Sequence, residues 1–275
     1  MTASDLDGDT RVTGERGVYS ATLSRAWEIW GPNGGYLATI ALRAAGAEAT
    51  IPTPASIYCQ FLRVAKFEHV EARVTVLQSG RRSESIRVTL IQDDKPVLEG
   101  LVRTALRGPG LEHDERRAPD VPRPETLATA DELRQPGAPH FAFWDNIEAR
   151  VISPERFDPD RGGLPAHWLE WYRYRPVATF TDSFLDAGRA LILIDTLGWP
   201  AVWLRHPKPA YLAPSLDVAV FFHSPLADSE WLLAEQESPI GSGGLIASTG
   251  RVFAHDGRLV ASGGAQLLCV DAPRG

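Results

Sequence analysis

The sequence predicts an α+β fold made of two tandem copies of one unit, each a helix wrapped by an antiparallel sheet. Both halves of the 275-residue chain contain a strand, then an apolar helix-forming run, then four strand-like runs. The last hairpins also correspond, since IQDDKPVLEGLVRTAL aligns with FAHDGRLVASGGAQLL without a gap, turn upon turn. Identities are few, so pattern rather than residue identity repeats, as expected of an old α+β duplication.

The N-terminal unit is expected at residues 1–108. A short strand at 17–23 precedes a helix that begins where Asn33 and two glycines lead into an Ala- and Leu-rich run, and that ends near Gly46. In the next runs apolar residues alternate with polar ones, as in Ile86, Val88 and Leu90, which is the period of a half-buried strand. The expected strands are 56–65, 69–80, 82–93 and 96–106.

A connector is expected at residues 109–165, because this stretch is dense in proline, glycine and charge. One short helix is expected in it, near 125–133. The C-terminal unit, 166–275, then repeats the plan, with a strand, a buried helix and four strands. These are expected at 167–176, 186–197, 215–224, 231–238, 244–256 and 257–270.

Composition excludes several classes of function. The net charge is −7 and no basic block occurs, so neither nucleic acid nor an anionic membrane is expected as the principal partner. No apolar run reaches the roughly 18 residues of a membrane span, and the polar N-terminus is unlike a signal peptide. Cys59 and Cys269 lack metal-site spacing and are expected to be buried free thiols in a reducing cytoplasm. No cofactor or metal is expected, since no HExxH, phosphate-loop or dinucleotide motif is present.

Asp195 stands out, because the run RALILIDTLGWPAV around it is apolar nearly all round and predicts a buried helix. A charged carboxylate there is costly unless it is hydrogen-bonded. Two interpretations are open: a partly exposed aspartate at the helix's single polar edge, or a catalytic carboxylate inside a pocket.

Several runs resemble the acyl-CoA thioesterase II (TesB-like) family, whose members have the double hotdog fold. In the first half these are SIYCQFLRVA and VEARVTVLQSGRRSESIRVTLIQDDKPVLEG. In the second half they are APSLDVAVFFHSP, WLLAEQES and the hairpin FAHDGRLVAS. Their shared order spans both halves and covers the connector poorly. The resemblance implies two tandem hotdog modules, a homo-oligomer (a dimer is favoured) and hydrolysis of an acyl-CoA to a free acid and CoA.

The resemblance also implies an Asp–Ser–Gln site in the second half that orients a water against the thioester carbonyl. By position the aspartate is Asp195 and the hydroxyl is Ser215. Ungapped alignment places Ala265 at the glutamine position, with Gln266 next to it. Because neighbouring strand residues face opposite ways, Gln266 faces the pocket only if Gly263 and Gly264 form a bulge. That bulge is expected here. Backbone N–H groups near a strand or helix end are candidates to hold the carbonyl oxygen, but those of residues 33–35 are not expected to contribute to this site.

Two other functions stay open: a non-catalytic acyl-binding module, and an enoyl-CoA hydratase or dehydratase that pairs Asp195 with His206. Asp217 is expected to satisfy backbone donors. His223 is expected to be a hydrogen-bonded core histidine, the alternative being a position that borders the CoA channel. Arg63, Arg81 and Arg82 are candidates for contacts with CoA phosphates, although exposed arginines usually meet only water.

Overall fold

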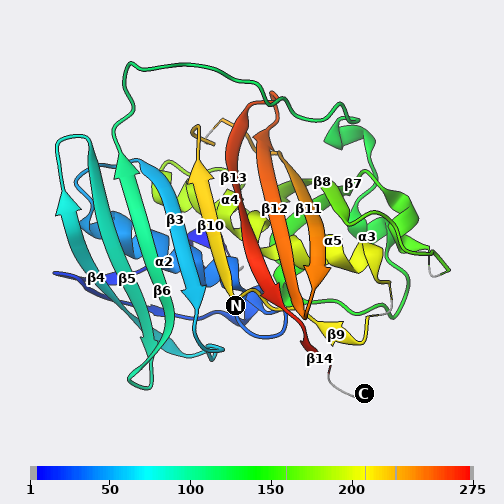
Figure 1. Ribbon diagram of the computed structural model, residues 1–275, viewed down its shortest axis with the longest axis horizontal. Coiled ribbons are helices and arrows are strands. Elements are labelled where there is room, and N and C mark those ends of the chain that lie inside the picture. Colours follow the sequence, from blue (N-terminus) through cyan, green and yellow to red (C-terminus); the bar gives the residue numbers. More distant parts are fainter. Residues whose placement is uncertain (1–4, 159, 208, 227, 273–275) are drawn as a thin grey trace.

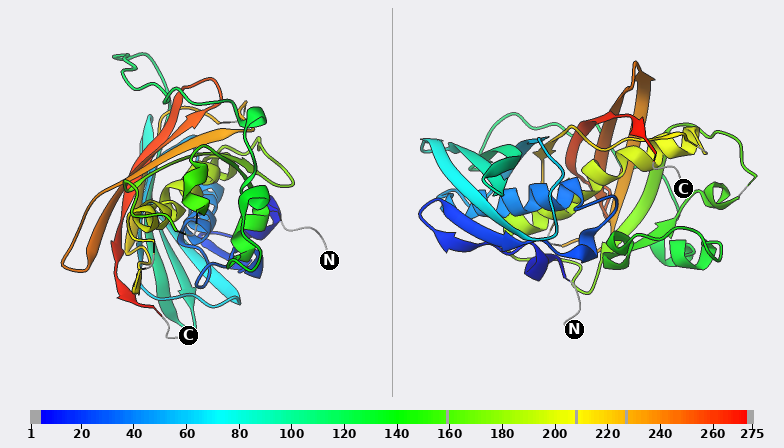
Figure 2. Two further views of the ribbon diagram at one scale, coloured as in Figure 1. Left: turned by 90° about the vertical axis from the view of Figure 1, so that its right-hand side faces the viewer. Right: turned by 90° about the horizontal axis from the view of Figure 1, so that it is seen from below.

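The chain forms one curved antiparallel sheet of twelve strands around two long helices (Figures 1 and 2). This computed structural model describes residues 5–158, 160–207, 209–226 and 228–272. Residues 1–4, part of the polar N-terminus mentioned above, lie outside them. Both helices, α2 (Gly34–Glu48) and α4 (Ser183–Thr196), lie on the concave face of the sheet and are almost entirely buried.

The strand order confirms the duplication. Read outward from the centre, the first half runs β3, β6, β5, β4, β2, β1 and the second runs β10, β13, β12, β11, β8, β7. The halves join where β3 and β10 pair antiparallel. The first-half strands are β1 (Thr13–Glu15), β2 (Val18–Thr22), β3 (Pro54–Phe61), β4 (His69–Ser79), β5 (Ser83–Gln92) and β6 (Lys95–Ala105). The second-half strands are β7 (Ile147–Val151), β8 (His167–Tyr174), β10 (Asp217–Phe222), β11 (Leu232–Ser242), β12 (Leu245–Ala254) and β13 (Leu259–Leu268).

Shorter elements join these strands. The helices are α1 (Leu6–Asp9), α3 (Ala130–Leu133) and α5 (Gly198–Arg205), with 3-10 turns η1 (Arg25–Trp27), η2 (Pro124–Thr126), η3 (Ala142–Asn146) and η4 (Pro154–Phe157). A separate pair is formed by β9 (Tyr211–Leu212) and β14 (Val270–Asp271). None of the described helices is both long and apolar enough to cross a membrane. Both cysteines are free thiols, as expected; Cys59 is buried, but Cys269 is half-buried and not buried as predicted.

Glycines let α2 and α4 pack closely and antiparallel. A Cβ at Gly188 would lie 2.5 Å from Thr39 Cγ2, and one at Gly35 would lie 2.6 Å from the Cα of Ile192. Real Cβ atoms do not approach other atoms so closely, so these positions require glycine unless the helices move apart. The close packing places the first turn of α2 against the last turn of α4.

The connector does more than link the halves. Its β7 extends the second-half sheet by pairing with β8, and η2 and α3 occupy the place expected for the short helix. Ahead of these, Ala118 and Val121 pack on a small apolar cluster that contains Trp171 and Trp231. The connector therefore covers part of the second-half sheet and, through η3 and η4, supplies a wall of the cavity described next.

Candidate active site

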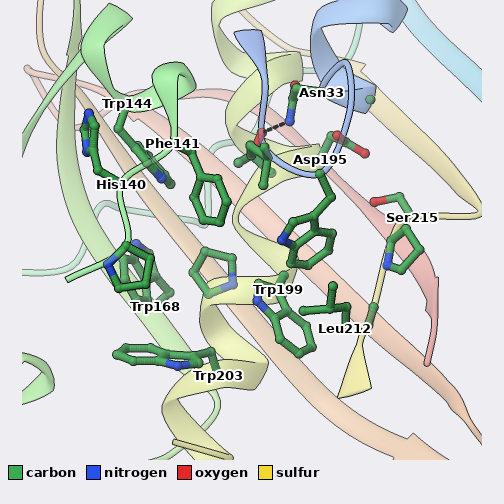
Figure 3. A pocket seen from close by; sticks show the side chains of 18 of the residues that line it. Asn33, His140, Phe141, Trp144, Trp168, Asp195, Trp199, Trp203, Leu212 and Ser215 are labelled. Atoms are coloured by element: carbon green, nitrogen blue, oxygen red, sulfur yellow. Dashed lines mark hydrogen bonds between the residues drawn. The ribbon is translucent and has the colours of Figure 1, made fainter. Parts of the chain in front are cut away.

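A cavity of about 960 Å³ lies beside the carboxyl end of α4. The amino end of α2, α5, β8 and the connector enclose it, and Asp195 and Ser215 lie together on its wall (Figure 3). Most of the lining is apolar. Such a concave apolar site with a few convergent polar groups is the usual form of a small-molecule site.

Asp195 is buried at this wall, with 4% of its surface exposed. Its Oδ2 accepts a hydrogen bond of 2.6 Å from the main-chain N–H of Gly35. Its Oδ1 is buried and has no hydrogen-bond partner of ordinary geometry among the described residues. The other two charges of α4 neutralise each other, since Arg189 pairs with Asp186 at 2.6 Å. Asp195 is thus a buried acid with one oxygen left to bind something else, as the pocket interpretation requires.

The environment of Asp195 prepares it for proton transfer. Burial raises the pKa of Asp195 to about 6, against the lowering effects of the Ser215 hydroxyl and the Gly35 N–H. Proton exchange is most effective when the pKa of the acid or base lies near the working pH. A carboxyl group with this pKa is ionised at neutral pH and remains a better base than an exposed aspartate.

The amino end of α2 reaches this site through the N–H of Gly35, although no contribution from residues 33–35 was expected there. Asn33 caps the helix, since its Oδ1 accepts from Tyr36 N at 2.9 Å, and its Nδ2 donates to Thr196 Oγ1 at 2.9 Å (Figure 3). A Cβ at Gly34 would lie 2.8 Å from Asp195 Oδ2. The two glycines therefore let the positive end of the helix approach the carboxylate. The hydrogen bond between Gly35 and Asp195 joins residues 160 positions apart, so it could not be predicted from the sequence of either half alone.

Backbone pairing fixes Ser215 in the site. The next residue, Leu216, donates to the carbonyl of Gln266 at 2.7 Å and accepts from the N–H of Phe61 at 2.9 Å. Ser215 itself forms an isolated bridge with Leu267. These hydrogen bonds hold the backbone at Ser215 from both sides. Its hydroxyl then points toward Asp195 on the same wall of the cavity (Figure 3).

Gln266 does not join this pair, which corrects the expectation of an inward glutamine. Gly263 and Gly264 pair in uninterrupted register with both β10 and β12, so no bulge forms there. The register shift in β13 lies near its start, opposite Val252 and Phe253. Beyond the shift, Ala265 faces inward with 7% exposure and the side chain of Gln266 is exposed. The inward position therefore carries a methyl group and supplies no amide.

The other sequence candidates lie apart from the chemistry. Asp217 Oδ1 accepts from the N–H of Gln266 at 3.0 Å, which confirms its backbone role. His223 Nε2 lies 2.8 Å from Ser262 Oγ and is exposed, not part of a buried core. His206 ends α5, is exposed and does not line the cavity, so it forms no acid–base pair with Asp195.

The arginine candidates separate into two groups. Arg63 lines the cavity beside the loop that leads into α2, where it donates to the carbonyl of Pro96 at 2.6 Å. Arg81 and Arg82 lie in the turn between β4 and β5 and do not line the cavity. The connector side chains His140, Phe141 and Trp144 do line it, and sequence reasoning missed them because nothing in a Pro- and Gly-rich stretch indicates where its aromatic residues point.

Comparison with known proteins supports this reading of the fold. The chain is similar to a TesB protein of Mycobacterium avium subsp. paratuberculosis, at 21% identity and a TM-score of 0.79 over 96% of this chain and 98% of that one. Acyl-CoA thioesterase II TesB2 from Mycobacterium marinum is 20% identical, with a TM-score of 0.79 over 98% and 99%. A conserved protein of unknown function with a hot dog fold from Alicyclobacillus acidocaldarius is 19% identical, with a TM-score of 0.83 over 98% of each chain.

Family models match most of the chain. The model of the acyl-CoA thioesterase N-terminal domain matches residues 23–105, and that of the acyl-CoA thioesterase C-terminal domain matches residues 120–270. The strand order independently shows two hotdog units in tandem. The chain therefore belongs to the acyl-CoA thioesterase family, as a TesB-like thioester hydrolase with a double hotdog fold.

Proposed function

We propose that this thioesterase hydrolyses its acyl-CoA with a water molecule that Asp195 activates. The observation that carries the proposal is a buried carboxylate at the wall of an apolar cavity, whose Oδ1 has no hydrogen-bond partner of ordinary geometry in the described part of the chain. A thioester needs no strong protein nucleophile, because a held and polarised water suffices when the oxyanion is stabilised. Ser215 is the second member of the proposed site, because its hydroxyl lies close enough to Asp195 to lower the pKa of that carboxyl. In this proposal the same hydroxyl holds the water in line with Asp195.

The reaction balances with these groups alone. Asp195 takes a proton as the water oxygen bonds to the thioester carbon, and the carbonyl oxygen becomes an oxyanion. When the tetrahedral intermediate collapses, the carbon–sulfur bond breaks. The CoA sulfur leaves with the proton that Asp195 took, and the free acid remains. Asp195 is neutral in the intermediate, and the second step returns it to its starting charge.

The amino end of α2 supplies the oxyanion site. The Asn33 cap accepts from Tyr36, and Asp195 accepts from Gly35, so neither uses the N–H of Gly34, the first of the helix. Gly34 lines the cavity next to Asp195. A helix N-terminus favours negative charge, and a developing oxyanion gains more from it than the neutral carbonyl does.

Asn33 supplies the amide that position 265 lacks. It is 7% exposed and lines the cavity on the same side as Asp195 (Figure 3). One Nδ2 hydrogen is used by Thr196, and the second is available for the water or the carbonyl oxygen.

The test is thiol release from a panel of acyl-CoA esters by the wild type, Asp195→Asn and Asp217→Asn. Asparagine preserves the shape of Asp195 and removes its basicity, so we expect kcat to fall by about 10²- to 10⁴-fold. Asp217→Asn is the matched control: its Oδ1 still accepts from Gln266, and its rate should stay within about twofold of wild type. Equal rates for Asp195→Asn and wild type would exclude Asp195 as the base.

The dimeric assembly and the cytoplasmic setting stay predictions. Sedimentation of the purified chain tests the first.

A further inference from the structure

The cavity beside Asp195 has walls made largely of flat rings. Five of the chain's eight tryptophans line it, together with phenylalanines from β3 and from the connector. A wall of this kind offers broad planar surfaces, whereas aliphatic side chains offer narrow and adaptable ones. The five tryptophans are Trp30, Trp144, Trp168, Trp199 and Trp203.

These rings are held in place from behind. Trp30 packs edge to face on Trp199 with ring centroids 5.5 Å apart, which joins the first half of the chain to α5. The Arg161 guanidinium lies 4.1 Å from the ring centroid of Trp203 and donates to that residue's carbonyl at 3.1 Å. Rigid walls favour a rigid occupant, because binding then orders few torsions on either side. A flat ring system fits this requirement better than a flexible straight chain.

Arg156, from η4 of the connector, gives the cavity a polar wall group. It lines the cavity and is 8% exposed. Its guanidinium lies 4.2 Å from the ring centroid of Trp168 and 4.6 Å from that of Phe157. Nη1 donates to Glu170 Oε1, and the described residues provide no acceptor for Nε or Nη2. A buried arginine with unused donors facing a cavity is an unfilled hydrogen-bonding site.

Glu170 determines whether a charged or a neutral hydrogen-bond acceptor can bind to Arg156. This carboxylate is 1% exposed and lines the same cavity. Its Oε2 accepts from the Tyr172 hydroxyl at 2.9 Å, and Tyr172 in turn accepts from Trp168 Nε1 at 2.7 Å. The positive charge of Arg156 is therefore already balanced. The Glu170 carboxylate would repel another negatively charged group bound to Arg156, whereas it would not repel a neutral hydroxyl or carbonyl oxygen in this way.

We propose that this cavity selects a flat, ring-bearing acyl group that carries a neutral oxygen, and that Arg156 donates a hydrogen bond to that oxygen. The inference rests on the proposed function in one respect, namely that the acyl group of the thioester occupies this cavity. It adds the class of substrate and a specificity-determining residue that does not touch the reacting atoms.

The first experiment compares CoA esters of similar size, of which the straight-chain, phenyl and hydroxyphenyl esters have the same number of acyl carbons. The set is nonanoyl-CoA, 3-phenylpropanoyl-CoA, 3-(4-hydroxyphenyl)propanoyl-CoA and 3-(4-carboxyphenyl)propanoyl-CoA, with 4′-hydroxybiphenyl and biphenyl analogues to extend the reach. We expect kcat/KM for the best hydroxylated ring ester to exceed that of nonanoyl-CoA by at least about tenfold. Equal or faster turnover of nonanoyl-CoA would overturn the ring preference, and a preferred carboxyphenyl ester would overturn the neutral acceptor.

The second experiment removes the donor. Arg156→Met alone would leave Glu170 charged and buried, so the informative variant is Arg156→Met/Glu170→Gln, with Arg156→Lys as a single-site companion. We expect the double variant to lose about tenfold in the ratio of kcat/KM for hydroxylated to unsubstituted ring esters, mainly through KM. Because both esters are measured on the same variant, a general effect on activity cancels in this ratio. An unchanged ratio in both variants would exclude Arg156 as the donor. Arg258→Met, at an exposed turn pair with Asp256, is the matched control.

A third measurement separates this inference from the proposed mechanism. Quenching of tryptophan fluorescence reports binding of the same esters to Asp195→Asn, whether or not any ester is hydrolysed. Tighter binding of hydroxylated ring esters supports the inference even if the wild type turns over none of them, a result that would count against the mechanism alone. Binding without preference for rings would overturn the inference even if Asp195 proves to be the base.

Discussion

Asp195 Oδ2 accepts a 2.6 Å hydrogen bond from the N–H of Gly35, and this contact joins the two hotdog units at one buried carboxylate. The site therefore belongs to the crossing of α2 and α4, not to the second unit alone. The opposite end of α4 is different, because Asp182 caps it by accepting from the N–H groups of Phe184 and Leu185. Both long helices thus have a side-chain cap at the amino end, Asn33 on α2 and Asp182 on α4, but the amino end of α2 also donates to a carboxylate from the other half.

The pKa of Asp195 predicts an acid limb in the pH profile. Only ionised Asp195 accepts a proton, and burial raises its pKa to about 6. We expect log kcat/KM to fall with unit slope below about pH 6 and to be flat above it until another group titrates. Asp217→Asn should keep the limb. A flat profile between pH 5 and 8 would show that the rate does not depend on this carboxylate.

The same shift predicts that Asp195→Asn stabilises the protein at neutral pH. The folded-state pKa of about 6 lies above the ordinary aspartate value of 3.8, so the folded state loses stability as the pH rises through this window. The neutral variant should gain little near pH 4 and up to about 2–3 kcal/mol above pH 6. Urea unfolding across this pH range measures the difference. A gain that is independent of pH would contradict the link to ionisation.

Ser215 and Gln266 should respond differently to truncation. Ser215→Ala removes the hydroxyl that faces Asp195, so we expect kcat to fall by about 10- to 100-fold. The same change should raise the pKa of Asp195 and move the acid limb to higher pH, because Ser215 lowers that pKa. Gln266→Ala, on the exposed face of β13, should leave both the rate and the limb unchanged. A large rate loss in Gln266→Ala would restore the glutamine to the site.

Substituting Gly34 should mainly lower activity, whereas substituting Gly35 should mainly lower stability. A Cβ at Gly35 meets the Cα of Ile192 at 2.6 Å, so Gly35→Ala forces the helices apart and should destabilise the fold by about 1–3 kcal/mol. A Cβ at Gly34 meets Asp195 Oδ2 and Phe61 Cζ, each at 2.8 Å, both of which are side-chain atoms at the cavity. Gly34→Ala should therefore lower kcat by at least about tenfold with the smaller change in melting temperature. Thermal unfolding and thiol release, measured on both variants, test whether Gly35→Ala loses more stability and Gly34→Ala retains more of it while losing activity.

Packing between the helices can be tested away from the site. A Cβ at Gly188 would lie 2.5 Å from Thr39 Cγ2, one helical turn or more from Asp195. Gly188→Ala should destabilise the protein by about 1–3 kcal/mol, and Thr39→Ala should relieve part of that loss in the double variant. A purely additive double variant would contradict direct contact between these positions.

The sequence by itself determined the repeated unit, the strands and the special status of Asp195. Period-two alternation and turn residues depend on local chemistry, so β4, β5 and β6 lie where the pattern placed them. The unusual position of an aspartate among Leu and Ile residues can likewise be recognised from the sequence of that helix alone, without knowledge of its neighbours in the fold. The connector was only partly predictable, because β7 and the cavity-lining aromatic residues depend on what they pack against.

Only the tertiary structure determined which residues lie next to Asp195 and line its cavity. Gly35 reaches it from the other half of the chain, and that contact needs both the antiparallel helix packing and the missing Cβ atoms. Gln266 lies outside the site because β13 has no bulge at Gly263 and Gly264, so Ala265 is the residue that faces inward and Gln266 faces outward. Arg156 enters the cavity because η4 packs it against Trp168 and Glu170. Sequence periodicity reports which side of an element is buried, whereas the identity of the neighbour is a property of the assembled fold.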